Sequence, residues 1–168
     1  LEGTIMTPLL VRLALGAHPQ GWIPIVVDQT TIRGRPVLMA GLRVAHRVLP
    51  VAFACYEYDT MRTSQNAIEQ ALLLVITACL PPGCKPVFVM DRGYARASLL
   101  TALRTINVPF LIRGRAQTMV RLGDRRLRLG RLRRRAGRAC RYLDVAYQDR
   151  ARERVIALRQ AYPHEGPR

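Results

Sequence analysis

Two aspartates in this chain each follow a run of apolar residues. Asp28 comes after Ile-Pro-Ile-Val-Val, and Asp91 comes after Val-Phe-Val-Met and precedes Arg-Gly-Tyr. Such runs, rich in β-branched side chains, are typical of buried strands. Two carboxylates at adjacent strand ends can hold divalent cations, and Mg²⁺ usually takes one or two protein carboxylates plus substrate phosphates. The alternative for each aspartate alone is a helix N-cap or a turn residue.

The apolar pattern predicts five strands and two helices before residue 116. The strands are expected at residues 23–28, 37–47, 48–56, 86–91 and 109–115. The helices are expected from Ser64 or Asn66 to about Leu80, and over residues 95–106. A tight connection is expected at Leu49-Pro50, and connections this short favour antiparallel neighbours.

The expected order is β-β-β-α-β-α-β, which predicts an α/β fold with a mixed sheet covered by helices. In such a sheet the first strand commonly lies beside the fourth and parallel to it. Asp28 and Asp91 would then lie side by side at the carboxyl end of the sheet, where open α/β sheets bind ligands. We therefore expect the two aspartates to act as a catalytic, metal-binding pair.

The charge of the chain points to a polyanionic partner. There are 27 basic residues against 11 acidic ones, a net charge of +16. Nucleic acid is the commonest partner of such a surface; a membrane surface and ribosomal-type RNA are the alternatives. The longest apolar segment is interrupted by Glu69 and Gln70, so no membrane span is expected. Because Glu2 replaces the basic start of a signal peptide, a cytoplasmic location is expected.

The cysteine and histidine positions do not predict a zinc site. The four cysteines have no Cys-x-x-Cys spacing, and none of the three histidines is in metal-finger register with them. Cys79 and Cys84 flank a Pro-Pro-Gly turn and are expected to be reduced, partly buried thiols.

Arginines dominate the second part of the chain, residues 116–168. Ten of them lie between Arg121 and Arg141, with leucines alternating among them. This alternation predicts a two-faced β-hairpin with its turn near Gly130, and a further strand is expected at 154–162. The second part is thus expected to be a β-rich extension of the first. The candidate DNA-binding residues are Arg33 and Arg35, on a turn expected near Asp28, and Arg125, Arg126, Arg128, Arg131, Arg133, Arg134 and Arg135; a solvated charged face is the alternative.

The two acidic motifs also carry a family resemblance. The segments VVDQTT and VFVMDRGYARASLLTALRTINVPFLIRGR resemble the catalytic core of bacterial insertion-sequence transposases of the DDE type. The most specific part is Asp-Arg-Gly-aromatic, followed by a helix and an apolar strand ending in Ile-Arg. The chain is similar to the group that carries a Tyr-Arg-Glu-Lys signature on a later helix. The resemblance covers residues 23–115 well and 116–162 loosely.

The resemblance implies an RNase H-like fold and metal-dependent DNA strand cleavage and transfer. Asp28 and Asp91 would be metal ligands, with Mg²⁺ or Mn²⁺ as the cofactor and DNA as the partner. A dimer is one state expected of the full-length protein, but the sequence leaves the oligomeric state open. On this interpretation residues 1–22 are a leader or linker, 23–115 part of the catalytic core, and 116–168 a truncated β-rich insertion.

The third acid of the family signature is the main departure. The signature places Glu seven residues after Tyr and Lys fourteen after it. Glu153 follows Tyr147 by six residues, and position 161 is alanine. Glu153 is therefore a weak candidate, and the chain is expected to bind DNA without transposing it.

Two other functions are alternatives to transposition. The first is a non-catalytic DNA-binding remnant or regulator of a full-length transposase. The second is a phosphotransferase with an aspartate nucleophile, which Thr30 disfavours because a second acid would be expected at that position.

Overall fold

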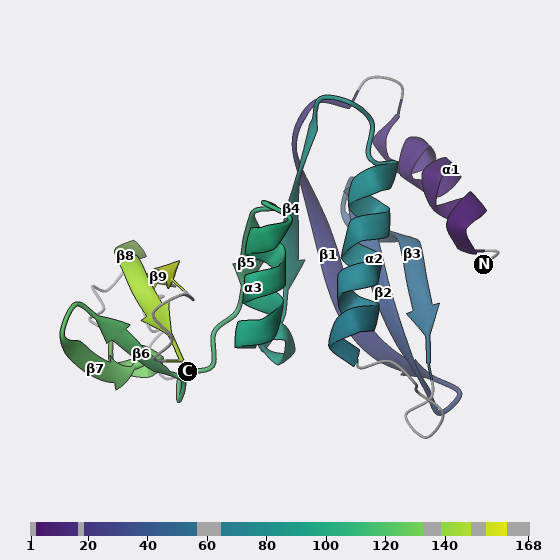
Figure 1. The fold of residues 1–168 in the computed structure, drawn as a ribbon. Coiled ribbons are helices and arrows are strands. Elements are labelled where there is room, and N and C mark those ends of the chain that lie inside the picture. The colour runs from purple at the N-terminus through teal and green to yellow at the C-terminus, as the bar shows by residue number, and fades with distance from the viewer. Residues whose placement is uncertain (1–2, 17–18, 57–64, 133–138, 149–153, 161–168) are drawn as a thin grey trace, which may run out of the picture. The chain divides into compact units, whose positions relative to one another are not determined.

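The computed structural model describes residues 3–16, 19–56, 65–132, 139–148 and 154–160. The chain divides into two compact units, Leu1–Arg113 and Gly114–Arg168. Figure 1 labels the elements of both units.

The first unit is built on a five-stranded mixed sheet. Its strands are β1 (Gly21–Ile32), β2 (Arg35–Val44), β3 (Arg47–Cys55), β4 (Cys84–Met90) and β5 (Phe110–Ile112), in the order β3-β2-β1-β4-β5. β1, β2 and β3 form an antiparallel meander, whereas β4 runs parallel to β1 and β5 parallel to β4. The expected element order and the parallel pairing of the first and fourth strands are confirmed.

The connection between the second and third strands differs from the expectation. The turn lies at Ala45-His46, where Ala45 has φ +52°, and not at Leu49-Pro50. Pro50 instead lies inside β3, opposite Gly41, at an irregularity in the ladder. Because β3 is an edge strand, a residue without an N–H is tolerated there. The prediction gave too much weight to proline as a turn signal.

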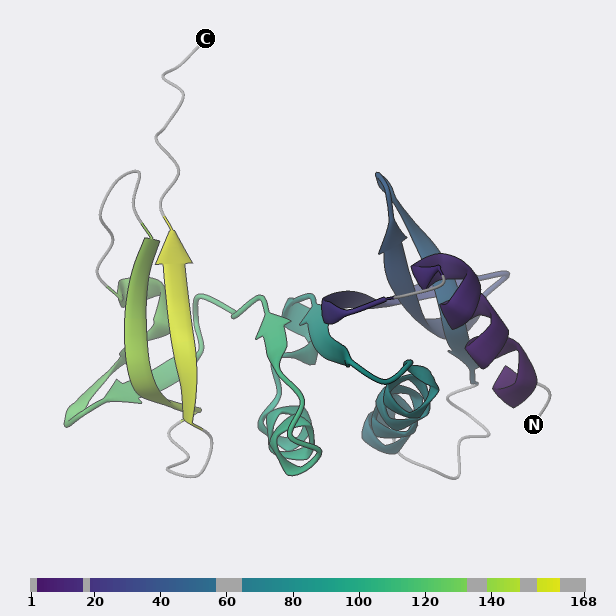
Figure 2. The ribbon, with the colours of Figure 1, turned by 90° about the horizontal axis from the view of Figure 1, so that it is seen from above.

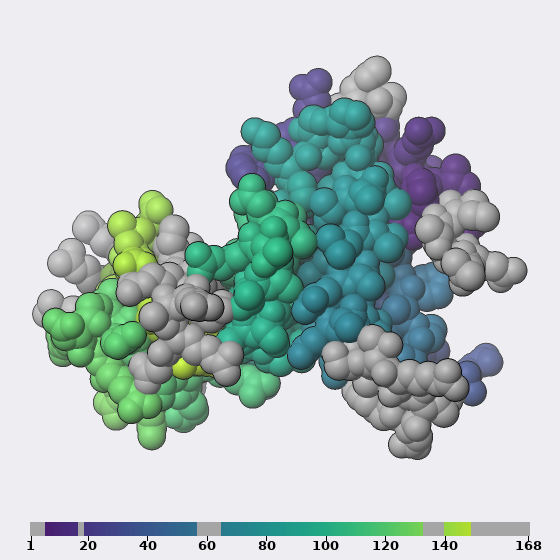
Figure 3. Space-filling view, in the orientation of Figure 1, coloured from purple at the N-terminus to yellow at the C-terminus, as the bar shows by residue number. Residues whose placement is uncertain are grey.

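Three α-helices belong to this unit: α1 (Gly3–Leu15), α2 (Gln65–Cys79) and α3 (Ala97–Thr105). α2 and α3 lie on one face of the sheet (Figure 2), and they are neighbours on the surface of this unit (Figure 3). They match the two predicted helices within a few residues. α1 contacts α2, β2 and β3, and its Val11 is fully buried in the same core. No helix was predicted in this segment, which was interpreted as a leader or linker.

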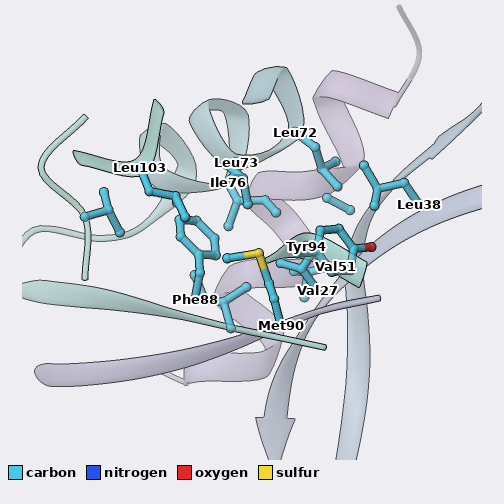
Figure 4. Close-up of a cluster of buried hydrophobic side chains, with 14 of the residues drawn as sticks. Val27, Leu38, Val51, Leu72, Leu73, Ile76, Phe88, Met90, Tyr94 and Leu103 are labelled. Atoms are coloured by element: carbon cyan, nitrogen blue, oxygen red, sulfur yellow. The ribbon is translucent and has the colours of Figure 1, made fainter. Parts of the chain in front are cut away.

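The core lies between the sheet and these helices. Ile25 and Val27 of β1 and Phe88 and Met90 of β4 are buried on the helix-covered face, against apolar side chains of α2 and α3 (Figure 4). Side chains that alternate with them point to the other face. A short 3₁₀ helix, η1 (Arg92–Tyr94), connects β4 to α3 and buries Tyr94 in the core.

The other face of the sheet is not covered by any helix of the described chain. Trp22 of β1 and Phe53 of β3 are each 62% exposed there, and Leu111 of β5 is 55% exposed. Val26 and Val89, which are neighbours in the ladder, are only partly buried. The sheet therefore has one packed face and one open apolar face.

The second unit is a four-stranded antiparallel sheet in the order β7-β6-β8-β9. Its strands are β6 (Met119–Leu122), β7 (Arg125–Arg128), β8 (Ala139–Tyr147) and β9 (Arg154–Gln160), and a 3₁₀ helix, η2 (Leu129–Arg131), follows β7. The arginine-rich hairpin is present, but its turn is Gly123-Asp124 and not near Gly130. Gly123 supplies the positive φ that a two-residue turn needs.

Two phenylalanines of the first unit test the assignment of the two sheet faces. Phe88→Ala should lower the free energy of unfolding by about 3–5 kcal/mol, because it removes a fully buried ring from the core. Phe53→Ala is the matched control on the open face and should change it by less than about 1 kcal/mol. Urea unfolding of the three proteins measures both values. A large loss for Phe53→Ala would mean that the second face is packed.

Candidate functional site

The ladder between β1 and β4 brings the two predicted acids together. Val27 pairs with Met90, so the residues that follow, Asp28 and Asp91, are adjacent on strands about 4.8 Å apart. Val27 and Met90 both point into the core. Asp91 has an extended backbone (φ −76°, ψ 174°) that continues the alternation of β4. Both aspartates are exposed, and both project from the open face of the sheet.

Only one of the two acids ends its strand. Asp91 directly follows β4, as predicted, but Asp28 lies inside β1, which continues to Ile32. There Asp28 is paired with Met39 of β2. The expected end at residue 28 is wrong because Thr30 continues the β-rich run up to a two-residue turn. The pair is formed by register, not by two coinciding strand ends.

If Asp91 served as a helix N-cap, its carboxylate would accept a capping hydrogen bond from the backbone of η1. Asp91 occupies the N-cap position of η1, but its carboxylate makes no capping hydrogen bond. Its backbone carbonyl accepts the Tyr94 N–H at 3.1 Å, so the backbone alone forms the turn. The Asp28 carboxylate accepts the N–H of Gln29 at 2.8 Å. Asp91 thus presents its carboxylate on the open face without using it to cap the helix.

The neighbours of the pair are apolar on one side and basic on the other. Met39 and then Phe53 follow Asp28 across β2 and β3. On the other side, the register of β4 with β5 places Arg113 next to Asp91, and the Arg113 N–H donates to the carbonyl of Met90 at 3.2 Å. An anionic ligand approaching the acids would therefore meet a guanidinium beside them.

Two adjacent carboxylates fit a hard divalent cation such as Mg²⁺ or Mn²⁺, which prefers oxygen ligands. They do not make a complete set of ligands. Nowhere in the described part of the chain do three or more histidine, cysteine or acidic side chains gather closely enough to hold a metal ion. Glu153, the weak candidate for a third acid, lies outside the described residues. Waters, substrate oxygens or a further carboxylate would have to complete the coordination.

A buried ion pair lies on the helix side of the sheet, where sequence reasoning did not expect one. Glu69 of α2 is 2% exposed and pairs with Arg96, the residue that precedes α3. Its sequence signal is a single carboxylate inside the apolar helix segment. Burial raises the pKa of the nearby Tyr94 hydroxyl above its ordinary value, and the negative charges of Glu69 and Asp28 add to this effect.

The arginines predicted near Asp28 lie further away. Arg33 and Gly34 form the turn between β1 and β2, with φ values of +50° and +80°. Arg33 is five residues beyond Asp28, roughly 17 Å at about 3.4 Å per strand residue. Arg33 and Arg35 thus flank Gly34 on a turn, as expected, but that turn is not close to Asp28. They lie at the tip of a hairpin and are exposed.

In the second unit the strand register decides which arginines share a face. Arg121 of β6 is directly opposite Arg126 of β7, and Arg128 lies two residues further on the same side. These three define the basic face. Arg125 is next to Arg126 in the strand and therefore points to the opposite side of the sheet, the side on which Leu127 lies. Arg131 is exposed in η2, and Arg133, Arg134 and Arg135 lie outside the described residues.

The basic face contains a residue that sequence reasoning did not select, Arg121. Together with Arg126 and Arg128 it places three arginine side chains on one side of the ladder. The alternation of arginine and leucine was visible in the sequence, but the pairing of Arg121 depends on the position of the turn.

Comparisons with known proteins do not identify a family for this chain. The chain matches no protein-family model and no curated protein. Among the described residues, no helix has the length and apolar character needed to cross a membrane.

Proposed function

We propose that this chain is part of the catalytic core of a DDE-type DNA transposase, with Asp28 and Asp91 as ligands of Mg²⁺ or Mn²⁺. The observation that carries the proposal is the adjacent placement of the two carboxylates on the open face. The strand order β3-β2-β1-β4-β5, with β4 parallel to β1, supports an RNase H-like arrangement of the first unit.

Each residue near the pair has a role that follows from its position. A bound Mg²⁺ would polarise a phosphodiester and lower the pKa of a water molecule. Asp28 and Asp91 would hold that cation on a surface open to a nucleic-acid backbone. Arg113 would offset the negative charge of a phosphate beside Asp91.

The basic face of the second unit supports DNA as the substrate. Arg121, Arg126 and Arg128 present three guanidinium groups on one side of a two-stranded ladder, where they can contact successive phosphates. Contacts to phosphates do not depend on the base sequence, so this surface would position DNA without selecting a particular sequence. The net charge of +16 adds long-range attraction to any duplex.

A second function, a DNA-binding regulator without catalytic activity, is favoured by one observation. The described residues contain no third carboxylate beside Asp28 and Asp91. A cation held by two carboxylates alone would be weakly bound and its water poorly oriented. We therefore expect DNA binding with at most trace strand nicking.

A plasmid-nicking assay distinguishes these two functions. With Mn²⁺, the chain should nick supercoiled DNA slowly, and Asp91→Asn should abolish the activity because it removes a metal ligand. Asp124→Asn, an exposed acid in the turn between β6 and β7, is the charge-matched control and should nick like the wild type.

Three results of this assay would change the proposal. Nicking that persists in Asp91→Asn contradicts the catalytic assignment. No nicking by the wild type favours the regulator. Efficient cleavage would contradict the incomplete coordination and make Glu153 the next residue to substitute.

The salt dependence of duplex binding tests the basic face. Replacing Arg121, Arg126 and Arg128 with alanine should reduce the slope of log K against log salt concentration by about 0.9 for each phosphate that the variant no longer neutralises. A control with alanine at Arg12, Arg47 and Arg104 of the first unit changes the net charge equally and should alter the slope less. Fluorescence anisotropy between about 50 and 200 mM salt measures both. Equal slopes for the two triple variants would mean that the basic face is only a solvated surface.

A further inference from the structure

A chain of hydrogen bonds connects the backbone segments of the two acids through the packed side of the sheet. At its centre, Gln65 of α2 donates from its amide nitrogen to the side-chain oxygen of Gln29 at 2.9 Å and to Oε1 of Glu69 at 3.0 Å. Glu69 in turn pairs through Oε2 with Nη2 of Arg96. We refer to Gln29, Gln65, Glu69 and Arg96 as the polar network.

The chemistry of Glu69 fixes the orientation of the network. An ionised carboxylate only accepts hydrogen bonds, so Gln65 must turn its NH₂ group toward it. The second hydrogen of that group then points to the carbonyl oxygen of Gln29. Gln29 is the residue after Asp28, and its backbone N–H donates to the Asp28 carboxylate. Holding the Gln29 side chain therefore restricts the segment that carries Asp28.

The other end of the network reaches the segment that carries Asp91. The backbone N–H of Arg96 donates to the carbonyl of Tyr94 at 2.7 Å, and the N–H of Tyr94 donates to the carbonyl of Asp91 at 3.1 Å. The Arg96 guanidinium also lies 5.9 Å from the centre of the Tyr94 ring. Arg96 thus holds η1, the turn that begins at Asp91.

The energetics of the buried pair favour a role beyond stability. Burying a carboxylate costs several kcal/mol, and replacing a buried ion pair with apolar side chains is often neutral or stabilising. Glu69 lies in α2 among Leu72, Leu73 and Ile76, where a leucine would pack well. What the ion pair provides, and leucine would not, is a directed connection between Gln65 and Arg96.

We propose that the polar network positions Asp28 and Asp91 for a divalent cation, with Glu69 and Arg96 as positioning residues. The inference rests on the proposed metal-binding function of the two acids. Glu69 itself is not assigned as a ligand, because its two oxygens are engaged by Gln65 and Arg96. Residues that orient metal ligands typically contribute about 10–100-fold to metal affinity.

The test compares Glu69→Leu/Arg96→Leu with the wild type and with Gln70→Ala, a control on the same helix outside the network. The double substitution removes both charges together and so leaves no unpaired buried ion. Mn²⁺ affinity is measured from the paramagnetic broadening of the Asp28 and Asp91 carboxyl signals in carbon-13-labelled protein. Amide hydrogen exchange of Gln29 and Tyr94 is measured without metal.

The double variant should bind Mn²⁺ about 10–100-fold more weakly than the wild type. The amides of Gln29 and Tyr94 should exchange faster in it. Its midpoint of thermal unfolding should stay near that of Gln70→Ala. Wild-type affinity together with wild-type exchange would overturn the proposal and leave the pair a purely structural contact. If the double variant does not fold, Gln65→Ala, at a partly buried site, is judged by the same two measurements.

The two measurements separate the inference from the function on which it rests. If Mn²⁺ broadens neither carboxyl signal of the wild-type protein, the proposed metal site is refuted, whatever the variants show. The exchange of Gln29 and Tyr94 then decides whether the network holds the two segments: faster exchange in the double variant supports it, and unchanged exchange refutes it.

Discussion

The parallel pairing of β1 with β4 is the constraint on which the candidate site depends. Its register aligns Val27 with Met90, and this alignment places Asp28 and Asp91 side by side. A slip of one residue in either strand would send one aspartate into the core, because side chains alternate between the faces of a sheet. Burial of Ile25, Val27, Phe88 and Met90 opposes that slip. The hydrophobic core and the site are specified by the same alternation.

The two faces of the sheet have different tasks. The helices α1, α2 and α3 pack on one face and form the core of the first unit together with the side chains of that face. The acids lie on the other face, among partly exposed apolar residues such as Val26 and Val89. The polar network crosses from the helices to the acid-bearing segments. If the proposed function holds, a substitution within the packed layer would affect metal binding on the open face.

Sequence patterns were most informative where local signals were strong. β-branched runs and helical periodicity predicted the order of strands and helices along the chain, the helices α2 and α3, and the position of Asp91 after a strand. The turns at Ala45-His46 and Gly123-Asp124 were missed, because proline and an isolated glycine elsewhere gave stronger turn signals. The extension of β1 beyond Asp28 was missed because threonines suit a turn as well as a strand.

Two features that depend on which particular side chains meet were not predicted from the sequence. Glu69 and Arg96 are 27 residues apart, and nothing near either one indicates the other. The opposition of Arg121 and Arg126 depends on the exact position of the hairpin turn. In both cases the residue types were visible, and the fold decided which of them meet.

The central claim is that Asp28 and Asp91 bind one divalent cation between them. Crystals grown with Mn²⁺ and measured at a wavelength where manganese scatters anomalously test it most directly. The claim predicts one anomalous peak between the two carboxylates, with oxygen distances of about 2.0–2.6 Å for a hard divalent cation. The absence of a peak there at saturating Mn²⁺, or a peak only at other acidic residues, would contradict it.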